Sequence, residues 1–267
     1  MPFLQTNGIR LYFEEHGSGP PLLLIMGITA PGSVWEKHLA YWQKSFRCII
    51  ADNRGIGLTD IPAGPYTTAQ MADDYAGLLD HLELQAVKVV GCSMGSTIAQ
   101  QLALRHPTKV QAMVLMCPWA RCDNNAKAIF KNMVQCKASL KPEDFALHMQ
   151  LLIFSKSSWD DDARVTEMEE GRKQASLQPD NQPLQGLVGQ AAACASHDVL
   201  KQLSQIKQPV LVIGGSADIF TPGWMAKEVA ANLPHSTLHL YTGKGHVFHW
   251  EELNDFNERV EKWLLSH

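Results

Sequence analysis

A serine between two glycines is the residue of this chain best suited to covalent chemistry. It stands in Gly91-Cys92-Ser93-Met94-Gly95, directly after a strand-like apolar run and directly before a stretch with helical spacing. A Gly-x-Ser-x-Gly turn between strand and helix needs small residues on both sides, and it exposes the serine hydroxyl at a helix N-terminus. The alternative is a chance glycine-rich turn with a capping serine. Because both flanks fit the first interpretation, the motif predicts that Ser93 is a nucleophile.

A serine hydroxyl at neutral pH needs a general base, and the base needs an acid that orients it. Asp218 follows the apolar run 210–213, on a loop where the carboxyl end of a strand would place it beside a ligand. The alternative for Asp218 is an Asx turn or a helix cap ahead of Pro222. The position of Asp218 after this strand favours the role of the acid.

The candidate base is one of eleven histidines in the chain. His246 directly follows Gly243-Lys244-Gly245, at the end of the last strand-like run, and His249 is a competing candidate three residues later. A surface-loop histidine without a catalytic role is the alternative. In the serine hydrolase order of serine, acid and histidine, the pattern predicts a triad of Ser93, Asp218 and His246.

An acyl-transfer reaction also needs backbone N–H donors for the negatively charged oxygen of its intermediate. One donor is the residue after the nucleophile, Met94, and the other comes from the loop after an early strand, Met26-Gly27-Ile28. Gly27 permits an unusual turn that would aim the Ile28 N–H, or its own, at the site. A plain glycine at the end of a strand is the alternative.

Short apolar runs bounded by Gly and Pro must position these residues. Continuous runs of this kind predict strands buried on both faces of a mainly parallel sheet, here over residues 22–25, 47–51, 87–90, 112–116 and 210–213. Residues 9–15 and 237–241 alternate instead, which indicates a hairpin strand and an edge strand. Helical spacing over residues 69–82 and 97–105 completes the alternation that is typical of a doubly wound α/β fold.

The alternation of strands and helices stops between residues 118 and 207. That segment is polar, contains no strand-like run and has helical patterning, so we expect a helical cap inserted into a core of residues 1–117 and 208–267. Its clustered apolar side chains predict an apolar pocket, and the alternative is that they pack cap helices against each other. The predicted substrate-binding residues are Gly27, Trp119, Phe154, Trp159 and Phe220.

Composition excludes several other classes of function. The net charge of −4 gives no reason to expect nucleic acid or a membrane surface as a partner, and no run of about 18 apolar residues is present. The chain has no His-Glu-x-x-His motif and no Cys-x-x-Cys pair, so no metal or other cofactor is expected. Without a secretory signal pattern, the six cysteines indicate free thiols in a cytoplasmic protein. Cys92 is expected to point into the sheet.

The ordered motifs resemble those of the α/β-hydrolase family from about residue 8 to the end. Beside the Ser93 pentapeptide they comprise the segments 17–21, 52–57, 105–110, 218–222 and 245–251. The resemblance implies Ser93 as nucleophile, His246 as base, Asp218 as acid and a helical cap that selects the substrate. Two residues depart from the family pattern: Met26 stands where a His is usual, and Ser96 where Gly is frequent.

Within this family the chain is most similar to small-molecule carboxylesterases, enol-lactonases and hydrolases of small amide-like or enamine substrates. We therefore expect a hydrolase of a small carboxylic ester or lactone that forms an acyl-enzyme intermediate. The alternatives are a hydrolase of an amide-like or enamine substrate, and a ligand sensor of the same fold that retains the triad. The sequence identifies neither the substrate nor the oligomeric state.

Overall fold

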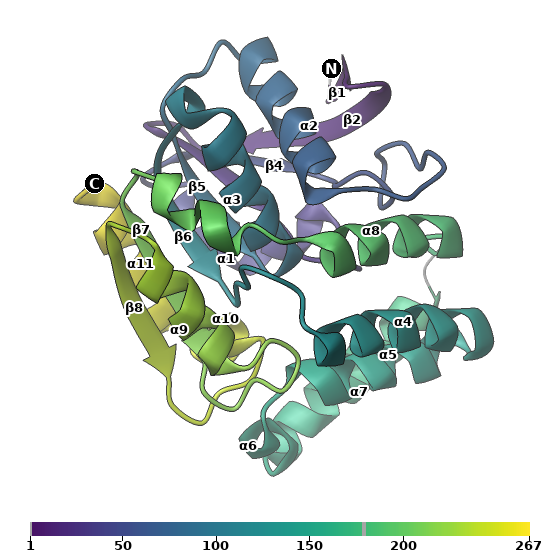
Figure 1. The fold of residues 1–267 in the computed structure, drawn as a ribbon. Helices are drawn as coiled ribbons and strands as arrows, with labels where there is room; N and C mark the ends of the chain where they lie inside the picture. Colours follow the sequence, from purple (N-terminus) through teal and green to yellow (C-terminus); the bar gives the residue numbers. More distant parts are fainter. Residues whose placement is uncertain (1, 178–179) are drawn as a thin grey trace.

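An eight-stranded sheet forms the centre of the protein. The computed structural model describes residues 2–177 and 180–267, and the strands lie in the order β1-β2-β4-β3-β5-β6-β7-β8 (Figure 1). Their bounds are β1 Phe3–Thr6, β2 Ile9–His16, β3 Pro21–Ile25, β4 Arg47–Ala51, β5 Val87–Cys92, β6 Val110–Met116, β7 Val210–Gly215 and β8 Ser236–Tyr241. β1 and β2 are antiparallel to their neighbours, and all other pairs are parallel. The predicted mainly parallel α/β sheet is confirmed.

The predicted hairpin at the start of the chain is formed by β1 and β2. Its two-residue turn is Asn7-Gly8, with φ of 44° and 78°. Positive φ at both positions is typical of the type I′ turn, whose twist matches that of the strands, and Asn-Gly is its preferred sequence. The hairpin extends the sheet at one edge, while β8 forms the opposite edge, as its alternating pattern predicts.

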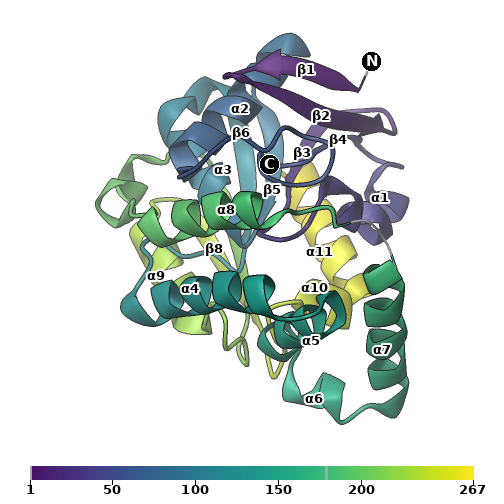
Figure 2. The ribbon, with the colours of Figure 1, turned by 90° about the vertical axis from the view of Figure 1, so that its right-hand side faces the viewer.

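Helices cover both faces of the sheet, which explains why its central strands are apolar at successive positions. In β3, for example, Leu23 and Ile25 pack into one core cluster, whereas Leu22 and Leu24 pack into the other. Figure 2 shows helices on either side of the sheet. One face carries α1 (Glu36–Trp42) and α11 (Leu253–Leu265), and the other carries α2 (Thr68–His81), α3 (Met94–Arg105) and α9 (Gly223–Asn232).

The described part of the segment between β6 and β7 consists of helices, loops and one isolated bridge. Residues 178–179 lie outside the described ranges. Its elements are α4 (Asn124–Ser139), α5 (Pro142–Ile153), α6 (Lys156–Trp159), α7 (Asp162–Leu177), α8 (Leu184–Ser196) and the short 3₁₀ helix η3 (Leu200–Gln205). α4 to α7 lie beyond the carboxyl ends of the strands (Figure 1). α8 instead packs closely on the core, where a Cβ at Gly186 would approach the Gly55 carbonyl oxygen to 2.0 Å. None of the described helices is long and apolar enough to span a membrane.

Candidate active site

Ser93 occupies a strained turn between β5 and α3. Its φ of 54° and ψ of −117° lie in a region that residues other than glycine rarely adopt. The turn leaves no room for larger neighbours: a Cβ at Gly91 would lie 2.4 Å from the Gly95 carbonyl oxygen, and a Cβ at Gly95 would lie 2.1 Å from that of Ile25. Steric crowding therefore requires both glycines.

The Ser93 side chain lines a cavity of about 490 Å³ at the carboxyl edge of the sheet. The residue is buried, and its Oγ has no hydrogen-bond partner among the residues that the structure describes. A buried hydroxyl without a partner costs free energy, and most such groups in proteins are satisfied. The fold thus holds a strained and unpaired hydroxyl at a cavity wall. Ser96 is one of the two departures from the family pattern. It donates its hydroxyl to the Ser93 carbonyl oxygen at 2.6 Å and so stabilises the turn.

Asp218 and His246 form a buried pair beside the same cavity. His246 Nδ1 lies 2.8 Å from Asp218 Oδ2, and Thr221 Oγ1 lies 2.8 Å from the same carboxylate oxygen and 3.0 Å from Nδ1. The other oxygen, Oδ1, accepts the backbone N–H groups of Phe220 and Thr221 at 2.8 and 3.0 Å. With Nδ1 donating to the carboxylate, Nε2 of His246 is left with its lone pair and can accept a proton.

His249, the competing histidine, has different partners. Its Nδ1 lies 2.9 Å from His38 Nε2, and His38 Nδ1 lies 2.6 Å from Asn257 Oδ1. The Asn257 oxygen accepts only, so His38 donates from Nδ1 and accepts the proton of His249 Nδ1 at Nε2. Burial, together with the neighbouring His38 and His246, lowers the pKa of His249 well below its ordinary value. His249 also lines the cavity, but among the residues that the structure describes it has no acidic hydrogen-bond partner.

The loop after β3 lies directly against Ser93. A Cβ at Gly27 would lie 3.2 Å from Ser93 Cβ and 3.7 Å from its Oγ, so only a glycine leaves space in front of the hydroxyl. Asn53 Nδ2 donates to the carbonyl oxygen of Met26 at 2.9 Å, and Tyr75 donates its hydroxyl to Asn53 Oδ1 at 2.9 Å. The loop is thus held through a backbone carbonyl, and this hydrogen bond does not involve the side chain of residue 26.

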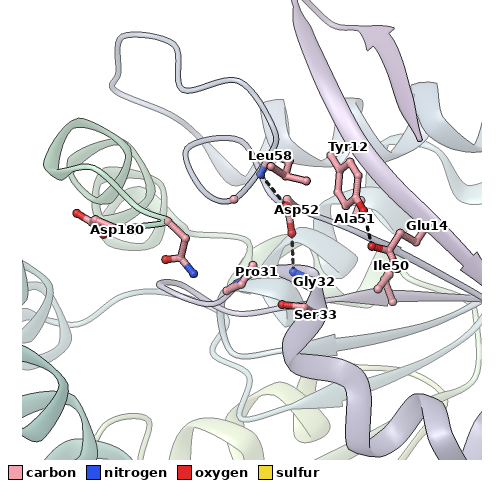
Figure 3. Close-up of a pocket in the computed structure, with 12 residues that line it drawn as sticks. Tyr12, Glu14, Pro31, Gly32, Ser33, Ile50, Ala51, Asp52, Leu58 and Asp180 are labelled. Carbon is pink, nitrogen blue, oxygen red and sulfur yellow. Dashed lines mark hydrogen bonds between the residues drawn. The ribbon is translucent and has the colours of Figure 1, made fainter. Parts of the chain in front are cut away.

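Figure 3 shows a second set of hydrogen bonds that holds this loop. They lie around another cavity, of about 410 Å³, that residues 31–33 also line. Asp52 Oδ1 accepts the Gly32 N–H at 2.7 Å, and Oδ2 accepts the Leu58 N–H at 2.8 Å. Because both oxygens of Asp52 are engaged, this carboxylate serves the backbone. The Ile28 N–H therefore belongs to a loop that is fixed on both sides, and Met94 is the first residue of α3, whose N–H has no partner within the helix.

The cavity at Ser93 includes two of the five predicted substrate-binding residues. Gly27 and Phe220 line it, and the Phe220 ring packs on His246 with a centroid distance of 5.0 Å. Trp119 is buried in the core between Phe130 and His197 and does not line the cavity. Phe154 and Trp159 do not line it either; Phe154 borders a neighbouring cavity, described below. The remaining wall from the inserted segment consists of Met149, Ile153, Ala175 and Asn181.

Two cysteines lie beside the site and neither is poised to react. Burial and the charge of Asp218 raise the pKa of the Cys92 thiol to about 12, so it stays protonated at neutral pH. Cys117 donates its Sγ–H to the His246 carbonyl oxygen at 3.1 Å. Among the described residues, Cys117, Asp218 and His246 form the one group whose potential metal-ligating atoms lie close together, within 4.8 Å. In this group Asp218 Oδ2 and His246 Nδ1 are hydrogen-bonded to each other.

Sequence reasoning missed three residues that hold the site in place. Thr221 contacts both members of the Asp218–His246 pair, Asn53 holds the loop at Gly27, and Glu251 binds the backbone N–H of Gly245 at 2.8 Å. Thr221 could have been found from its place three residues after the acid, where a hydroxyl commonly bonds back to a carboxylate. No local pattern identifies Asn53, because its partners lie 27 and 22 residues away.

Comparison with known proteins adds relatives along nearly the whole chain. A family model described as the alpha/beta hydrolase fold matches residues 20–253. A protein of Mycobacterium tuberculosis named as a non-heme bromoperoxidase, BpoC, is 33% identical over 267 residues, covering 97% of this chain and 98% of that one. A protein of Caulobacter sp. (strain K31) named as a carbamate hydrolase, RutD, is 30% identical and covers 95% of each chain. The solved structure of a thermophilic esterase from Thermogutta terrifontis superposes with a TM-score of 0.85 at 26% identity, over 100% of this chain and 97% of that one.

Proposed function

Because the chain belongs to the α/β-hydrolase family, we propose that it is a serine hydrolase that cleaves a small carboxylic ester or lactone through Ser93, His246 and Asp218. One observation carries this proposal. A strained serine with an unpaired, buried hydroxyl shares a cavity with a histidine whose Nδ1 is held by a buried carboxylate. Such strain at a cavity wall is typical of functional sites.

In the proposed reaction, Ser93 Oγ attacks the carbonyl carbon of the ester and its proton passes to His246 Nε2. The N–H groups of Met94 and Ile28 donate to the oxyanion that forms. When the C–O bond to the alcohol breaks, His246 returns the proton to the leaving oxygen, and the acyl group remains on Ser93. A water molecule then attacks the acyl-enzyme while His246 accepts its proton, which releases the acid and restores the serine hydroxyl.

Among the described residues no hydrogen bond joins the Ser93 hydroxyl to His246, so the proposed reaction needs this bond to form when the substrate binds. Catalytic hydrogen bonds are often long before the substrate binds and tighten only in the complex. Asp218 keeps its charge beside the imidazolium that forms and fixes the ring orientation through Nδ1. Thr221, which donates to the same carboxylate oxygen, restrains Asp218 from the other side.

We further propose that the inserted segment 118–207 acts as a cap that selects the substrate. Met149, Ile153 and Ala175 supply apolar groups to the Ser93 cavity, which supports a largely uncharged substrate. The relative named as a carbamate hydrolase supports testing carbamates and amides beside esters and lactones. The six free cysteines support the proposed cytoplasmic location.

Ser93→Ala tests the proposal with p-nitrophenyl acetate, a lactone, a carbamate and an anilide as substrates. We expect hydrolysis of the preferred substrate to fall by roughly 10⁴-fold or more, because single triad deletions in serine hydrolases have effects of that order. The control is Ser33→Ala, which alters an exposed serine at the same cavity and should retain the wild-type rate. A Ser93→Ala enzyme that keeps more than about a tenth of the rate contradicts the assignment. A single burst of product without further turnover would favour the ligand sensor.

A further inference from the structure

A second cavity of about 380 Å³ lies between the inserted helices and the core, next to the cavity that contains Ser93. From the core it is bordered by Val34 and Trp250, and from α5 and α7 by Ile153, Met168 and Gly171. It contains none of the residues to which the proposed reaction assigns a chemical role. The proposed reaction at Ser93 therefore assigns no role to this second cavity.

The two cavities adjoin each other. Ser33, Val34, Ile153 and Trp250 line both of them, so the two cavities share a wall. A ligand that extends from Ser93 along these residues would reach the second cavity. The second cavity is an extension of the candidate active site along the seam between core and insertion.

The junction of the cavities is bordered by Ser33 and Val34, which follow the β3 loop, and on the other side by residues next to the His246 loop. Trp250 follows His246 by four residues, and Ile153 accepts the N–H of Val247 at 3.2 Å. In the proposed reaction His246 protonates the leaving oxygen, so the alcohol part of the ester must lie on the side of this histidine. The position of the junction therefore assigns the second cavity to the alcohol group of the substrate.

The walls of the second cavity define the chemistry of that group. Val34, Ile153, Phe154, Met168 and Trp250 supply apolar surface. The charged residues at its border are two bases and two acids: Lys37, Arg164, Glu36 and Glu167. Glu167 pairs with Lys37 at 3.4 Å and with Arg164 at 2.8 Å. Because the charges balance, the cavity offers no net charge to a ligand.

We propose that this second cavity is the binding subsite for the alcohol group of the substrate, and that this group is uncharged, apolar and extended. The inference rests on the proposed ester hydrolase function and adds the substrate class to it. It assigns a specificity role to Gly171 and Met168 of α7, which lie in the inserted segment. The second cavity should then make kcat/KM depend on the length of the alcohol group rather than on that of the acyl group.

Gly171 offers a direct test, because a Cβ at this position meets nothing within 4 Å. Gly171 is exposed and lines the second cavity, so Gly171→Phe would add a ring at the border of this cavity without displacing backbone. Gly171→Ala is the matched variant that adds a single methyl group. Alanine also favours the helical conformation over glycine. The substrates are methyl, butyl and hexyl acetate, with methyl butyrate and methyl hexanoate as the acyl series.

For the wild type we expect kcat/KM to rise by roughly fourfold per methylene of the alcohol until the space is filled. Gly171→Phe should lower kcat/KM for hexyl acetate by tenfold or more, while the rates with methyl acetate and with both methyl esters of longer acids stay within threefold of wild type. Gly171→Ala, which adds a single methyl group to the same wall, should lower the hexyl-to-methyl ratio of kcat/KM far less than Gly171→Phe does. An unchanged rate with methyl acetate also shows that the variant is folded, and Gly171→Leu serves if the Phe variant is not.

Three outcomes overturn the subsite. These are an unchanged hexyl-to-methyl ratio in Gly171→Phe, an equal loss on all esters in a folded variant, and a loss confined to the longer acyl groups. Each of them leaves the proposed function standing as long as hydrolysis depends on Ser93. If no ester is cleaved in a Ser93-dependent manner, the proposed function itself fails, and the two failures are thereby distinguished.

Discussion

At the scale of single residues, hydrogen-bond partners separate the two histidines of the last loop. His246 Nδ1 faces a buried carboxylate, whereas His249 Nδ1 faces another neutral imidazole. A carboxylate stabilises the imidazolium that a general base becomes, and a neutral ring with a strongly lowered pKa gives no such support. The geometry therefore favours His246 as the base, for a reason that spacing along the chain does not contain.

We predict that His246→Ala lowers kcat by roughly 10⁴-fold or more, whereas His249→Ala stays within about tenfold of wild type below its own melting temperature. Steady-state kinetics of both variants provide the check. A larger loss in His249→Ala than in His246→Ala would argue against His246.

At the scale of elements, one carboxylate joins the inserted segment to the His246 loop. Glu251 of α10 (Phe248–Glu251) accepts the Ser155 N–H at 3.0 Å and the Ser158 hydroxyl at 2.6 Å on one oxygen. The Gly245 N–H donates to the other oxygen at 2.8 Å. Burial alone would raise the pKa of Glu251, but these hydrogen bonds outweigh it and lower the pKa. The end of α5 and the start of α6 are thereby held against the residue that precedes His246.

Glu251→Gln should weaken this connection, because an amide carries no charge and presents two N–H groups to a site built from donors. We expect the free energy of unfolding to fall by about 1–3 kcal/mol and kcat to fall more than KM changes, since the His246 loop loses its restraint. The lowered pKa means that this stabilisation is present above the ordinary pKa of a glutamate and is lost on acidification below it.

The neighbouring residue provides the control for this prediction. Glu252 pairs with Lys244 at 2.6 Å on the surface, so Glu252→Gln should change the free energy of unfolding by less than about 1 kcal/mol. Urea denaturation at pH 7.5 and steady-state kinetics of both variants provide the measurements. Equal stability and equal kcat in the two variants would show that Glu251 does not position the loop.

At the scale of the whole molecule, a buried chain of polar side chains fastens three helices over one face of the sheet. His38 of α1 is hydrogen-bonded through one ring nitrogen to His249 of α10 and through the other to Asn257 of α11. Burial lowers the pKa of His38 to about 4, against a partial offset from the Asn257 hydrogen bond. A second proton on His38, at Nε2, would point an N–H at the N–H of His249, so this arrangement requires a neutral His38 ring.

The folded protein should therefore lose stability on acidification. An unfolded histidine takes up a proton near pH 6.5, while folded His38 does so only near pH 4, so the unfolded state binds more protons between these values. The contribution is fully present above pH 6.5 and declines as the pH falls toward 4, by roughly 3 kcal/mol for this one group. Urea denaturation from pH 8 to pH 4.5 should show that decline.

Comparison of two variants isolates this contribution. His38→Gln should flatten the decline in the free energy of unfolding with falling pH, although it also lowers stability at pH 8. His235→Gln, at an exposed histidine, should leave the slope as in the wild type. If both variants keep the wild-type slope, the buried histidine pair is not the source of acid sensitivity.

Much of the fold and the identities of the candidate catalytic residues followed from the sequence because their signals are local. Each central strand is a continuous apolar run, since both faces are covered, and the Ser93 turn needs only its own glycines and flanking elements. Asp218 and His246 each follow a strand of a parallel sheet. Parallel strands end at one edge, so their following loops come together there whatever the intervening helices do.

The tertiary structure decided which side chains surround the reaction centre. Trp119 lies only three residues beyond β6, yet it turns into the core beside Phe130, and the bonds of Asn53 and Glu251 span 27 and 96 residues. Helical periodicity identifies an apolar face but not the surface against which that face packs. The cavity walls, the restraints on the His246 loop and the subsite beside Gly171 arise from packing between distant segments, and no pattern in the neighbouring sequence encodes them.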